Sequence, residues 1–245
     1  MGGNKRGNNK KQLLQVIEKI YLGGLTEKIR LKINNNQLKV NFSVELKDCV
    51  GELTTPWERE DTELGIYNLT ELYKLIKVTT DPIQIDVVEK DGKAMKLEIK
   101  DNKFDLSYNL ADLGLISEGK ISNQMPEPSI VLNLNQDFIT KFKQAHVALD
   151  KVEVFSIQPK IDKQKIKTLE FVIGLQERYA NKITFSEPTE IYNELPKFIF
   201  KVANFKEILN NCSGSIKMIV YSMGIMKLET LEDNIRVDYY LVPQR

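Results

Sequence analysis

The sequence predicts an α+β fold of two repeated domains, each with two helices packed on antiparallel sheets. Three observations lead to this prediction. Amphipathic helices recur in both halves, alternating apolar and polar segments follow them, and the two halves close with similar segments. The chain has 245 residues, of which 42% are hydrophobic, so two domains of ordinary size with real cores are expected.

The first helix of each half is predicted from an apolar stripe at the spacing i, i+1, i+4, i+7. The two segments are KKQLLQVIEKI (10–20) and NQDFITKFKQAHVAL (135–149). The residues on the stripes are Leu13, Leu14, Ile17 and Ile20 in the first half and Phe138, Ile139, Phe142 and Ala145 in the second. Each stripe provides one face that a sheet can bury.

Strands are predicted after each of these helices, because apolar and polar residues alternate there. In the first half they are KIRLKI (28–33) and LKVNFSV (38–44), which are separated by a turn of three asparagines. In the second half they are KVEVFSI (151–157) and KTLEFVIGL (167–175).

The closing segments of the halves, 64–110 and 198–242, both predict a strand, a short helix, a turn and three strands. AMKLEIKDNKFDLSYNL in the first matches IMKLETLEDNIRVDYYL in the second almost step for step. Between the halves lies SEGKISNQMPEPSI, which is rich in Ser, Gly and Pro, as linkers are. We therefore expect a first domain at 1–120, a linker at 121–130 and a second domain at 131–245.

The polar faces of all four predicted helices carry lysines. A single lysine on a helix surface is usually only a solvated residue. Four basic helices are less ordinary in a chain with 35 basic and 34 acidic residues and a net charge of +1. The compensating acids must then lie on strands and loops, as in ELTTPWEREDTEL (52–64). Trp57 in this loop is either a contact residue or a local packing anchor.

The chain ends in NIRVDYYLVPQR (234–245). A last strand through Tyr239 and Tyr240 would stop before Pro243, because proline cannot donate to a sheet ladder. Residues 241–243 are then expected outside the sheet as an apolar tail. Such a tail either caps its own core or binds a partner, and the residues alone leave both open.

Several classes of protein are disfavoured. Two distant cysteines do not make a disulfide framework and favour a reducing compartment. No apolar run approaches the roughly 20 residues of a membrane span, and no signal peptide is evident. The one histidine, His146, has no partners at zinc or catalytic spacing, and no glycine-rich phosphate loop occurs. We therefore expect no enzyme, metal or cofactor. The basic start MGGNKRGNNKK is either a solvated terminus or an arm that touches DNA.

The repeat and the ending together resemble the DNA polymerase sliding clamps. DNIRVDYYLVP is similar to the end of proliferating cell nuclear antigen, and the length and GIYNLTELYKLI are similar to the clamps of T-even-type phages. The resemblance runs from about Lys10 to Pro243. The basic start and TEIYNELPKF (189–198) depart from it, which leaves the register of the second domain open.

This resemblance implies a DNA-clamp fold that closes as a homotrimeric ring around double-stranded DNA, without sequence preference. It implies as partners the replicative DNA polymerase and a clamp-loader ATPase, and no membrane. Helix lysines would meet phosphates in the ring. The residues that it assigns to DNA contact are Lys10, Lys11, Lys19, Lys74, Lys77, Lys141, Lys143, Lys201 and Lys206.

The resemblance also implies two protein interfaces. Strands at 103–109 and 181–187 would pair between subunits and so hide both edges. The subunit-interface residues would be Phe104, Leu106, Tyr108, Ile183 and Phe185. The linker and tail would frame an apolar pocket for partner peptides. Its residues would be Met125, Pro126, Ile130, Tyr240, Leu241, Val242 and Pro243.

Two other functions remain open at this point. One is a clamp-like processivity subunit that grips DNA as a monomer or dimer, although the net charge of +1 argues against the strongly basic face that it needs. The other is a structural or assembly protein built from duplicated domains, which does not account for the basic helices or the tail. The Lys-, Asn- and Ile-rich composition hints at a phage. We expect the cytoplasm of a bacterial host for a phage protein, and the nucleus for a protein of eukaryotes or their viruses.

Overall fold

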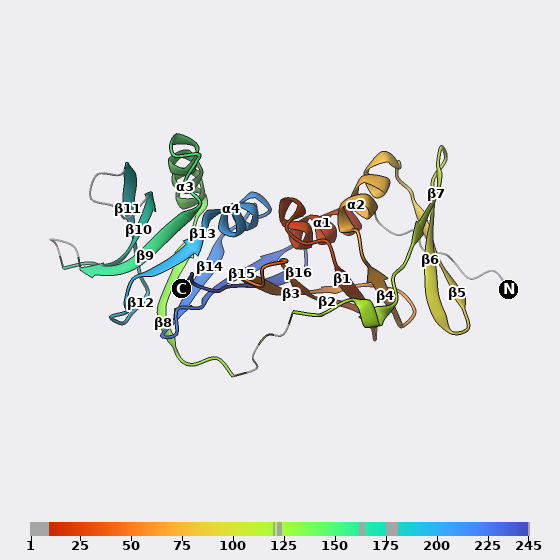
Figure 1. The fold of residues 1–245 in the computed structure, drawn as a ribbon, viewed down its shortest axis with the longest axis horizontal. Helices are drawn as coiled ribbons and strands as arrows, with labels where there is room; N and C mark the ends of the chain where they lie inside the picture. The colour runs from red at the N-terminus through yellow and green to blue at the C-terminus, as the bar shows by residue number, and fades with distance from the viewer. Residues whose placement is uncertain (1–9, 120, 122–123, 162–164, 175–180, 245) are drawn as a thin grey trace. The chain divides into compact units, whose positions relative to one another are not determined.

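The computed structural model describes residues 10–119, 121, 124–161, 165–174 and 181–244. These residues form two compact units, which are described separately (Figure 1). The first unit contains the described residues up to 45 together with 52–119. The second contains 46–51 and those that follow 119. The short segment 46–51 therefore belongs with the second unit, although it lies within the first half of the sequence.

The first unit contains two helices, two short 3₁₀ segments and two groups of strands. The elements are α1 (Lys10–Tyr21), η1 (Leu22–Gly24), β1 (Ile29–Asn34), β2 (Gln37–Ser43), β3 (Cys49–Pro56), β4 (Thr62–Ile66), α2 (Leu69–Val78), β5 (Gln84–Lys90), β6 (Lys93–Lys100), β7 (Asp105–Asn109) and η2 (Leu113–Leu115). The strand orders are β3-β2-β1-β4 and β5-β6-β7. Helices α1 and α2 pack side by side against these strands (Figure 1).

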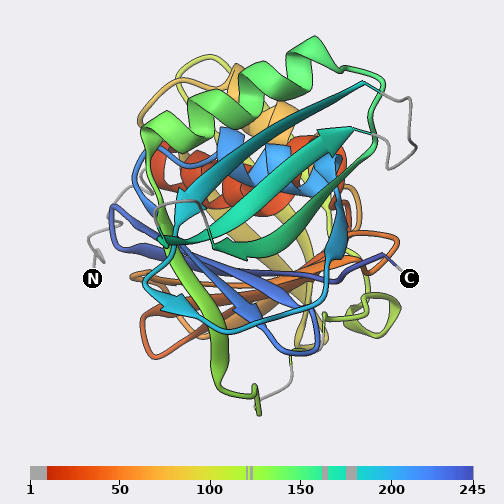
Figure 2. The ribbon, with the colours of Figure 1, turned by 90° about the vertical axis from the view of Figure 1, so that its left-hand side faces the viewer.

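The second unit repeats this plan. Its elements are β8 (Pro128–Leu134), α3 (Gln136–Ala148), β9 (Val154–Ile161), β10 (Lys167–Gly174), β11 (Lys182–Pro188), β12 (Ile191–Tyr192), β13 (Phe198–Lys201), α4 (Val202–Asn210), β14 (Ile216–Tyr221), β15 (Met226–Glu232) and β16 (Ile235–Leu241). The strand orders are β12-β8-β14-β15-β16 and β11-β10-β9-β13. Figure 2 faces β9, β10 and β11 (teal), with α3 (green) along their upper rim.

The predicted repeat is confirmed. Both units run helix, strands, helix and three strands, with β5-β6-β7 in the place of β14-β15-β16. One difference is β8, which begins at Pro128 inside the segment expected as linker and precedes α3. Another is the insertion at 189–198, where Ile191 and Tyr192 add the short strand β12 beside Val131 and Ile130 of β8.

Helices α2 and α3 begin at asparagines that cap them. The Asn68 side chain accepts a hydrogen bond from the Glu71 amide at 3.0 Å, and Asn135 accepts one from the Phe138 amide at 2.9 Å. The helix stripes are buried as expected, apart from Leu14, which is half-buried. The second unit fills its core with aromatic rings, and the Phe142 and Phe205 centroids lie 4.8 Å apart in an edge-to-face arrangement.

Two polar contacts fix the three-stranded sheet of the first unit to α2. The Tyr108 hydroxyl accepts from the Asn68 amide at 3.1 Å and donates to the Asn68 carbonyl at 3.0 Å. The Asp101 carboxylate accepts from the amides of Lys103 (2.7 Å), Phe104 (2.6 Å) and Thr80. Because one carboxylate holds both the β6–β7 turn and the segment after α2, the position of β7 depends on Asp101.

We predict that Asp101→Asn lowers the melting temperature at pH 7 and that the difference from the parent shrinks toward pH 3. Desolvation raises the pKa of Asp101. The hydrogen bonds from the amides of Lys103, Thr80 and Phe104 lower it by more, so the net pKa lies well below its usual range. A carboxyl whose folded pKa lies below its unfolded value of about 4 stabilises the fold above that pH, and this contribution is lost as the pH falls toward the folded pKa. Calorimetry at several pH values measures the difference.

The matched control is Asp105→Asn, because Asp105 is exposed and its ion pair within the described residues is with Lys100 at 3.3 Å. Surface pairs of this kind contribute little, so the control should melt close to the parent. A pH-independent loss of stability in Asp101→Asn would contradict the role of the charged carboxylate.

Candidate functional site

The helix face of the first unit combines lysines with a tyrosine that is hydrogen-bonded to a glutamate. Lys74 and Lys77 are exposed. The Lys77 ammonium lies 4.8 Å from the centre of the Tyr73 ring, and the Tyr73 hydroxyl donates to Glu18 at 2.7 Å. Burial and the hydrogen bond to Glu18 raise the pKa of Tyr73. The Lys10 ammonium donates to the carbonyl of Lys77 at 3.3 Å and to that of Thr79, so it is drawn toward the end of α2.

Of the four lysines of the second unit that were assigned to DNA contact, three form ion pairs. Lys141 bonds Asp137 at 2.6 Å and Glu187 at 3.3 Å, and the first of these contacts is the main reason that its pKa is raised. Lys201 pairs with Asp48 at 2.5 Å and Lys206 with Glu207 at 3.5 Å.

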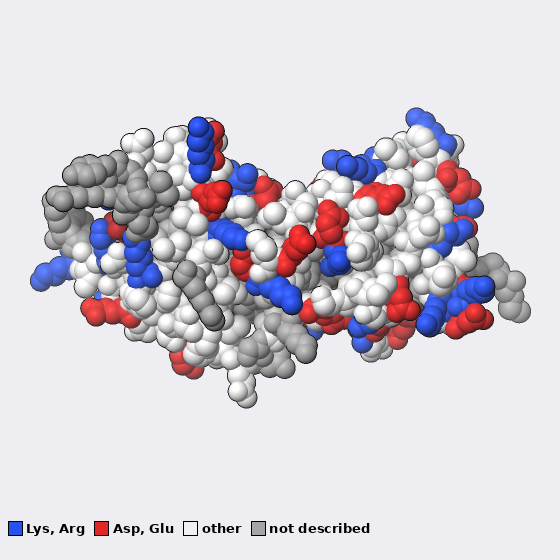
Figure 3. Space-filling model, viewed as in Figure 1, with Lys and Arg blue, Asp and Glu red and all other residues white. Residues whose placement is uncertain are grey.

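Lys74 in the first unit and Lys143 in the second have no ion pair with any described residue. Figure 3 shows the result on one face, where Lys and Arg alternate with Asp and Glu and form no continuous basic field. These two lysines are therefore the helix cations that remain most available to an anionic ligand.

Lys19 does not lie where the sequence predicted. It is 4% exposed, so the expectation that it faces outward from α1 is wrong. The buried stripe of α1 includes Val16, and residue 19 lies one helical turn beyond it at i+3. The hydrophobic side of α1 is therefore wider than the spacing of its leucines and isoleucines indicated.

β7 forms one end of the three-stranded sheet, and every second amide along it points outward. The Leu110 amide donates to the Met95 carbonyl at 2.9 Å, and the Asp101 amide donates to the Phe104 carbonyl at 3.0 Å. In an antiparallel ladder such bonded pairs alternate with unbonded ones. By the register of β6 and β7, the amides of 104, 106 and 108 face β6, and those of 105, 107 and 109 face away.

β11 forms an end of the four-stranded sheet of the second unit and follows the same rule. The Thr189 amide donates to the Lys167 carbonyl at 3.1 Å. Alternation along the register with β10 then directs the amides of Lys182, Thr184 and Ser186 away from the sheet. Pro188, which has no amide hydrogen, occupies the next outward position. Both segments assigned to subunit contact are thus edge strands.

The side chains assigned to this contact differ in exposure. Phe104 is exposed, and Leu106, Ile183 and Phe185 are half-buried. Phe185 also stacks on Phe171, with ring centres 5.5 Å apart. Tyr108 is buried, with its hydroxyl bonded to Asn68, so the expectation that it is available to a neighbouring subunit is wrong. Its side chain faces the core because its neighbours Ser107 and Asn109 take the outer face of β7.

The C-terminal tail leaves the sheet one residue later than predicted. Leu241 pairs with Met226 at the end of β16 and is 1% exposed, so its assignment to a partner surface is wrong. Beyond it, the Val242 amide donates to the Asp48 carbonyl at 2.9 Å, and the Gln244 amide donates to the Ile199 carbonyl at 2.8 Å. The tail is therefore held in place by backbone hydrogen bonds on both sides.

Apolar side chains are exposed on the tail and on the two turns that contact it, one through the hydrogen bond from Val242 to Asp48 and the other through the packing of Pro243 on Gly224. We define Leu46, Met223, Val242 and Pro243 as the tail patch. Leu46 is 72% exposed and Val242 is 40% exposed. Pro243 packs so closely on Gly224 that a Cβ there would lie 3.0 Å from its ring. Monomeric proteins rarely leave apolar groups clustered in this way without a use.

Tyr240 lies on the outer face of the sheet, one residue before the end of β16. Its half-buried ring centre is 5.5 Å from the Lys227 ammonium, which Glu229 (2.5 Å) and Asp238 (3.0 Å) hold in place. Burial lowers the pKa of Lys227, but these two carboxylates raise it overall. The lysine is therefore charged and fixes one side of the Tyr240 ring.

The linker lies on the neighbouring part of the same face. Met125 packs with Ile225 on a cluster of Val131, Ile219 and Tyr221. Pro126 is half-buried. Ile130 is fully buried, so its assignment to a partner surface is wrong. Strand alternation turns 130 toward the core and 131 outward.

Sequence reasoning missed Leu46, Met223 and Ile225. They lie in turns that only the fold brings to the tail and the linker, so no local pattern could have identified them.

The described residues contain no group of three or more His, Cys, Asp or Glu side chains that could hold a metal ion. None of their helices is long and apolar enough to cross a membrane. Both cysteines are buried and free, and burial together with Asp48 raises the pKa of Cys49 far above its usual range. Burial and Lys206 lower the pKa of His146, so that its imidazole is neutral at pH 7.

No protein-family model matches the sequence, and no curated protein sequence matches it either. Solved structures do match. The proliferating cellular nuclear antigen of Entamoeba histolytica aligns with a TM-score of 0.71 at 16% identity over 98% of this chain and 97% of its own. The A. fulgidus PCNA bound to the C-terminal region of FEN-1 aligns with a TM-score of 0.70 at 16% identity over 96% of each chain. The chain thus has the DNA-clamp fold of the proliferating cell nuclear antigens, as its sequence predicted.

Proposed function

We propose that this chain is a sliding clamp that encircles duplex DNA as a homotrimeric ring and tethers the replicative DNA polymerase without catalysing a reaction. The observation that carries the proposal is the match to PCNA structures over nearly the whole chain, with both units included. A clamp acts by topology, so it needs no catalytic group.

The edge strands supply a means of closing the ring. β7 and β11 each present outward amides and carbonyls, and they belong to different units of one chain. Pairing β7 of one copy with β11 of the next is a head-to-tail contact, which closes into a ring when the rotation allows. It also satisfies both edges, which would otherwise invite non-specific pairing.

The helix lysines supply the attraction to DNA. Contacts from Lys or Arg to phosphates are independent of sequence and weaken as salt rises. In this chain three of the nine lysines assigned to DNA contact, Lys141, Lys201 and Lys206, are partly neutralised by neighbouring carboxylates. We infer that the attraction is weak for each contact, which suits a ring that must slide.

The tail patch and the cluster on which Met125 packs, which consists of Val131, Ile219 and Tyr221, supply a docking surface for partner peptides. The A. fulgidus PCNA is bound to the C-terminal region of FEN-1. By analogy, we propose that polymerase and clamp-loader peptides insert apolar anchors between the tail patch and Met125. The proposed role places the protein where DNA is replicated, in the cytoplasm of a bacterial host or in a nucleus.

The ring proposal predicts that Ser107→Pro and Thr184→Pro each convert the assembly to monomers. Each proline removes an outward amide and leaves the bonds within its own sheet intact. Proline at Leu106 would instead remove a donor to β6, so it is a poor test of assembly. Sedimentation equilibrium measures the mass.

The matched controls are Ser107→Ala and Thr184→Ala, which keep the amide and should keep the parent mass. Proline variants that also keep the parent mass would contradict the assignment of these edges, and a monomeric parent would contradict the ring itself.

A second prediction concerns the helix faces. Lys74→Glu combined with Lys143→Glu should weaken DNA binding and processive synthesis while the assembly mass is unchanged. The plot of log K against log salt should flatten by roughly one unit for each phosphate that a lysine no longer neutralises. Fluorescence anisotropy across a salt series measures this slope.

The control is Lys32→Glu combined with Lys217→Glu, which makes the same charge change on strand faces that point away from the cores. Equal reductions in affinity in both double variants would show that net charge, and not the helix face, governs DNA binding.

A third prediction concerns the tail patch. Leu46→Ala combined with Val242→Ala should leave the melting temperature near that of the parent, because both side chains are exposed. Binding of a C-terminal peptide of the cognate polymerase should weaken by roughly 2 kcal/mol or more, since a few apolar anchors dominate such contacts. Calorimetric titration measures the affinity.

Leu231→Ala is the control, because Leu231 is an exposed leucine on β15 outside the patch. Full-strength binding by the double variant would exclude the patch as the docking surface, and a large fall in its melting temperature would identify the tail as a core cap.

A further inference from the structure

Among the described residues, β5 forms a second edge of a sheet in the first unit. In the second unit β14, which occupies the place of β5, pairs with β15 on one side and with β8 on the other. In the first unit β5 pairs with β6 on one side, and no strand of the described residues pairs with its other side. This edge is distinct from β7 and β11, which the proposed ring uses.

The backbone groups of Ile85 and Val87 point to this open side. In β6, Ile99 directs its backbone amide and carbonyl toward β7. Because these directions alternate along a strand, Glu98 directs its amide and carbonyl toward Asp86, its partner in β5. The residues on either side of Asp86 therefore direct their amides and carbonyls away from β6. Such a row of groups is a template for another strand.

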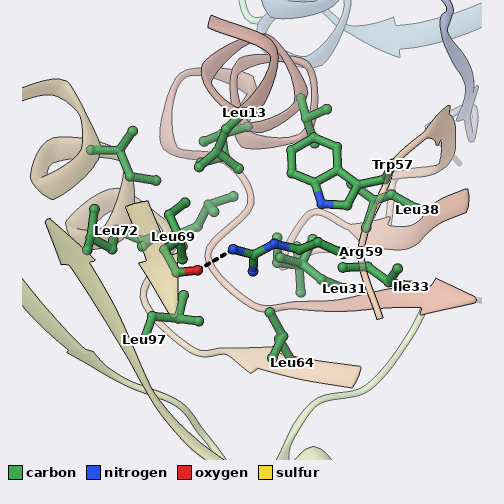
Figure 4. Close-up of a pocket in the computed structure, with 16 residues that line it drawn as sticks. Leu13, Leu31, Ile33, Leu38, Trp57, Arg59, Leu64, Leu69, Leu72 and Leu97 are labelled. Carbon is green, nitrogen blue, oxygen red and sulfur yellow. Dashed lines mark hydrogen bonds between the residues drawn. The ribbon is translucent and has the colours of Figure 1, made fainter. Parts of the chain in front are cut away.

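One arginine side chain forms a hydrogen bond with this open edge of β5. Arg59 comes from the loop between β3 and β4, and its Nη2 donates to the carbonyl oxygen of Ile85 (Figure 4). The loop is fixed by Trp57, whose amide donates to the Asn36 carbonyl at 2.8 Å and whose indole is buried. The structure thus identifies Trp57 as a packing anchor.

The surroundings of Arg59 explain why an arginine suits this place. Its side chain lies beside a cavity of about 50 Å³ whose other lining residues are all apolar (Figure 4). In the second unit β8 closes the corresponding side with the buried residues Ile130, Leu132 and Leu134. Here the long aliphatic stem of Arg59 covers apolar surface, while its guanidinium satisfies an edge carbonyl.

We propose that the Arg59 side chain blocks the open edge of β5 and so prevents the β5 strand of a second copy of this chain from pairing with it. A guanidinium has donors but no acceptor, so it satisfies the Ile85 carbonyl without continuing the ladder. Without it, two copies can pair β5 with β5 in an antiparallel, self-complementary contact that satisfies Ile85 and Val87 in both.

The test is Arg59→Met, which keeps an apolar stem and removes the guanidinium. Sedimentation velocity over a range of concentrations should show species of at least twice the parent mass, and the parent should show none. The comparison is with the parent mass, whatever that mass is, so the result does not depend on ring closure. Circular dichroism checks that each variant is folded, and Arg59→Gln replaces Arg59→Met if the latter is unfolded.

Two further variants separate strand addition from general loss of stability. Adding Val87→Pro removes an outward amide of β5, so the double variant should return to the parent mass. Leu64→Ala leaves a cavity in the same core without touching the edge, so it should lower the melting temperature without raising the mass.

Three results would overturn the proposal. They are a parent-like mass for the folded arginine variant, persistent association in the double variant, and equal association in Leu64→Ala.

Discussion

Every β-sheet ends in strands whose outer amides and carbonyls lack a partner, and the treatment of these ends shapes this molecule. Strand β14 is covered by β8, and the equivalent strand β5 meets the guanidinium of Arg59. The outer sides of β7 and β11 are left with outward amides at alternate residues, and Pro188 removes one donor from β11. Since unpaired edges invite association, the proposed ring is a specific use of two edges that the fold leaves open.

The positions of these edges depend on the same cores that hold the helices. Tyr108 and Asp101 connect the β6–β7 hairpin to the two ends of α2. In the second unit, Phe138 of α3 lies 5.7 Å from the Phe185 ring of β11. The helices that carry the lysines and the strands that would join subunits are therefore coupled by direct contacts within each unit. Close packing gives each unit a low compressibility, as the proposed ring would require.

On the face that Figure 3 shows, basic and acidic side chains are interspersed. Ion pairs neutralise Lys141, Lys201 and Lys206, while Lys74 and Lys143 have no ion pair with any described residue. Each phosphate contact adds to the affinity but does not depend on the base sequence, so such contacts allow movement along the duplex. The apolar tail patch is held by backbone hydrogen bonds from Val242 and Gln244, so its shape is set before a partner arrives. Such preorganisation reduces the ordering cost of binding.

The sequence by itself determined the repeat, the four helices and most of the strands, because helix and strand periodicities are local properties. It placed the end of β16 one residue too early. It also placed both edge strands, through the family resemblance. Tertiary structure decided the burial of Lys19, Tyr108, Ile130 and Leu241, since burial depends on which neighbours cover a face. It likewise brought Leu46 and Met223 to the tail and Arg59 to the edge of β5. These residues are distant in sequence from the groups that they meet, and only the packed chain determines such contacts.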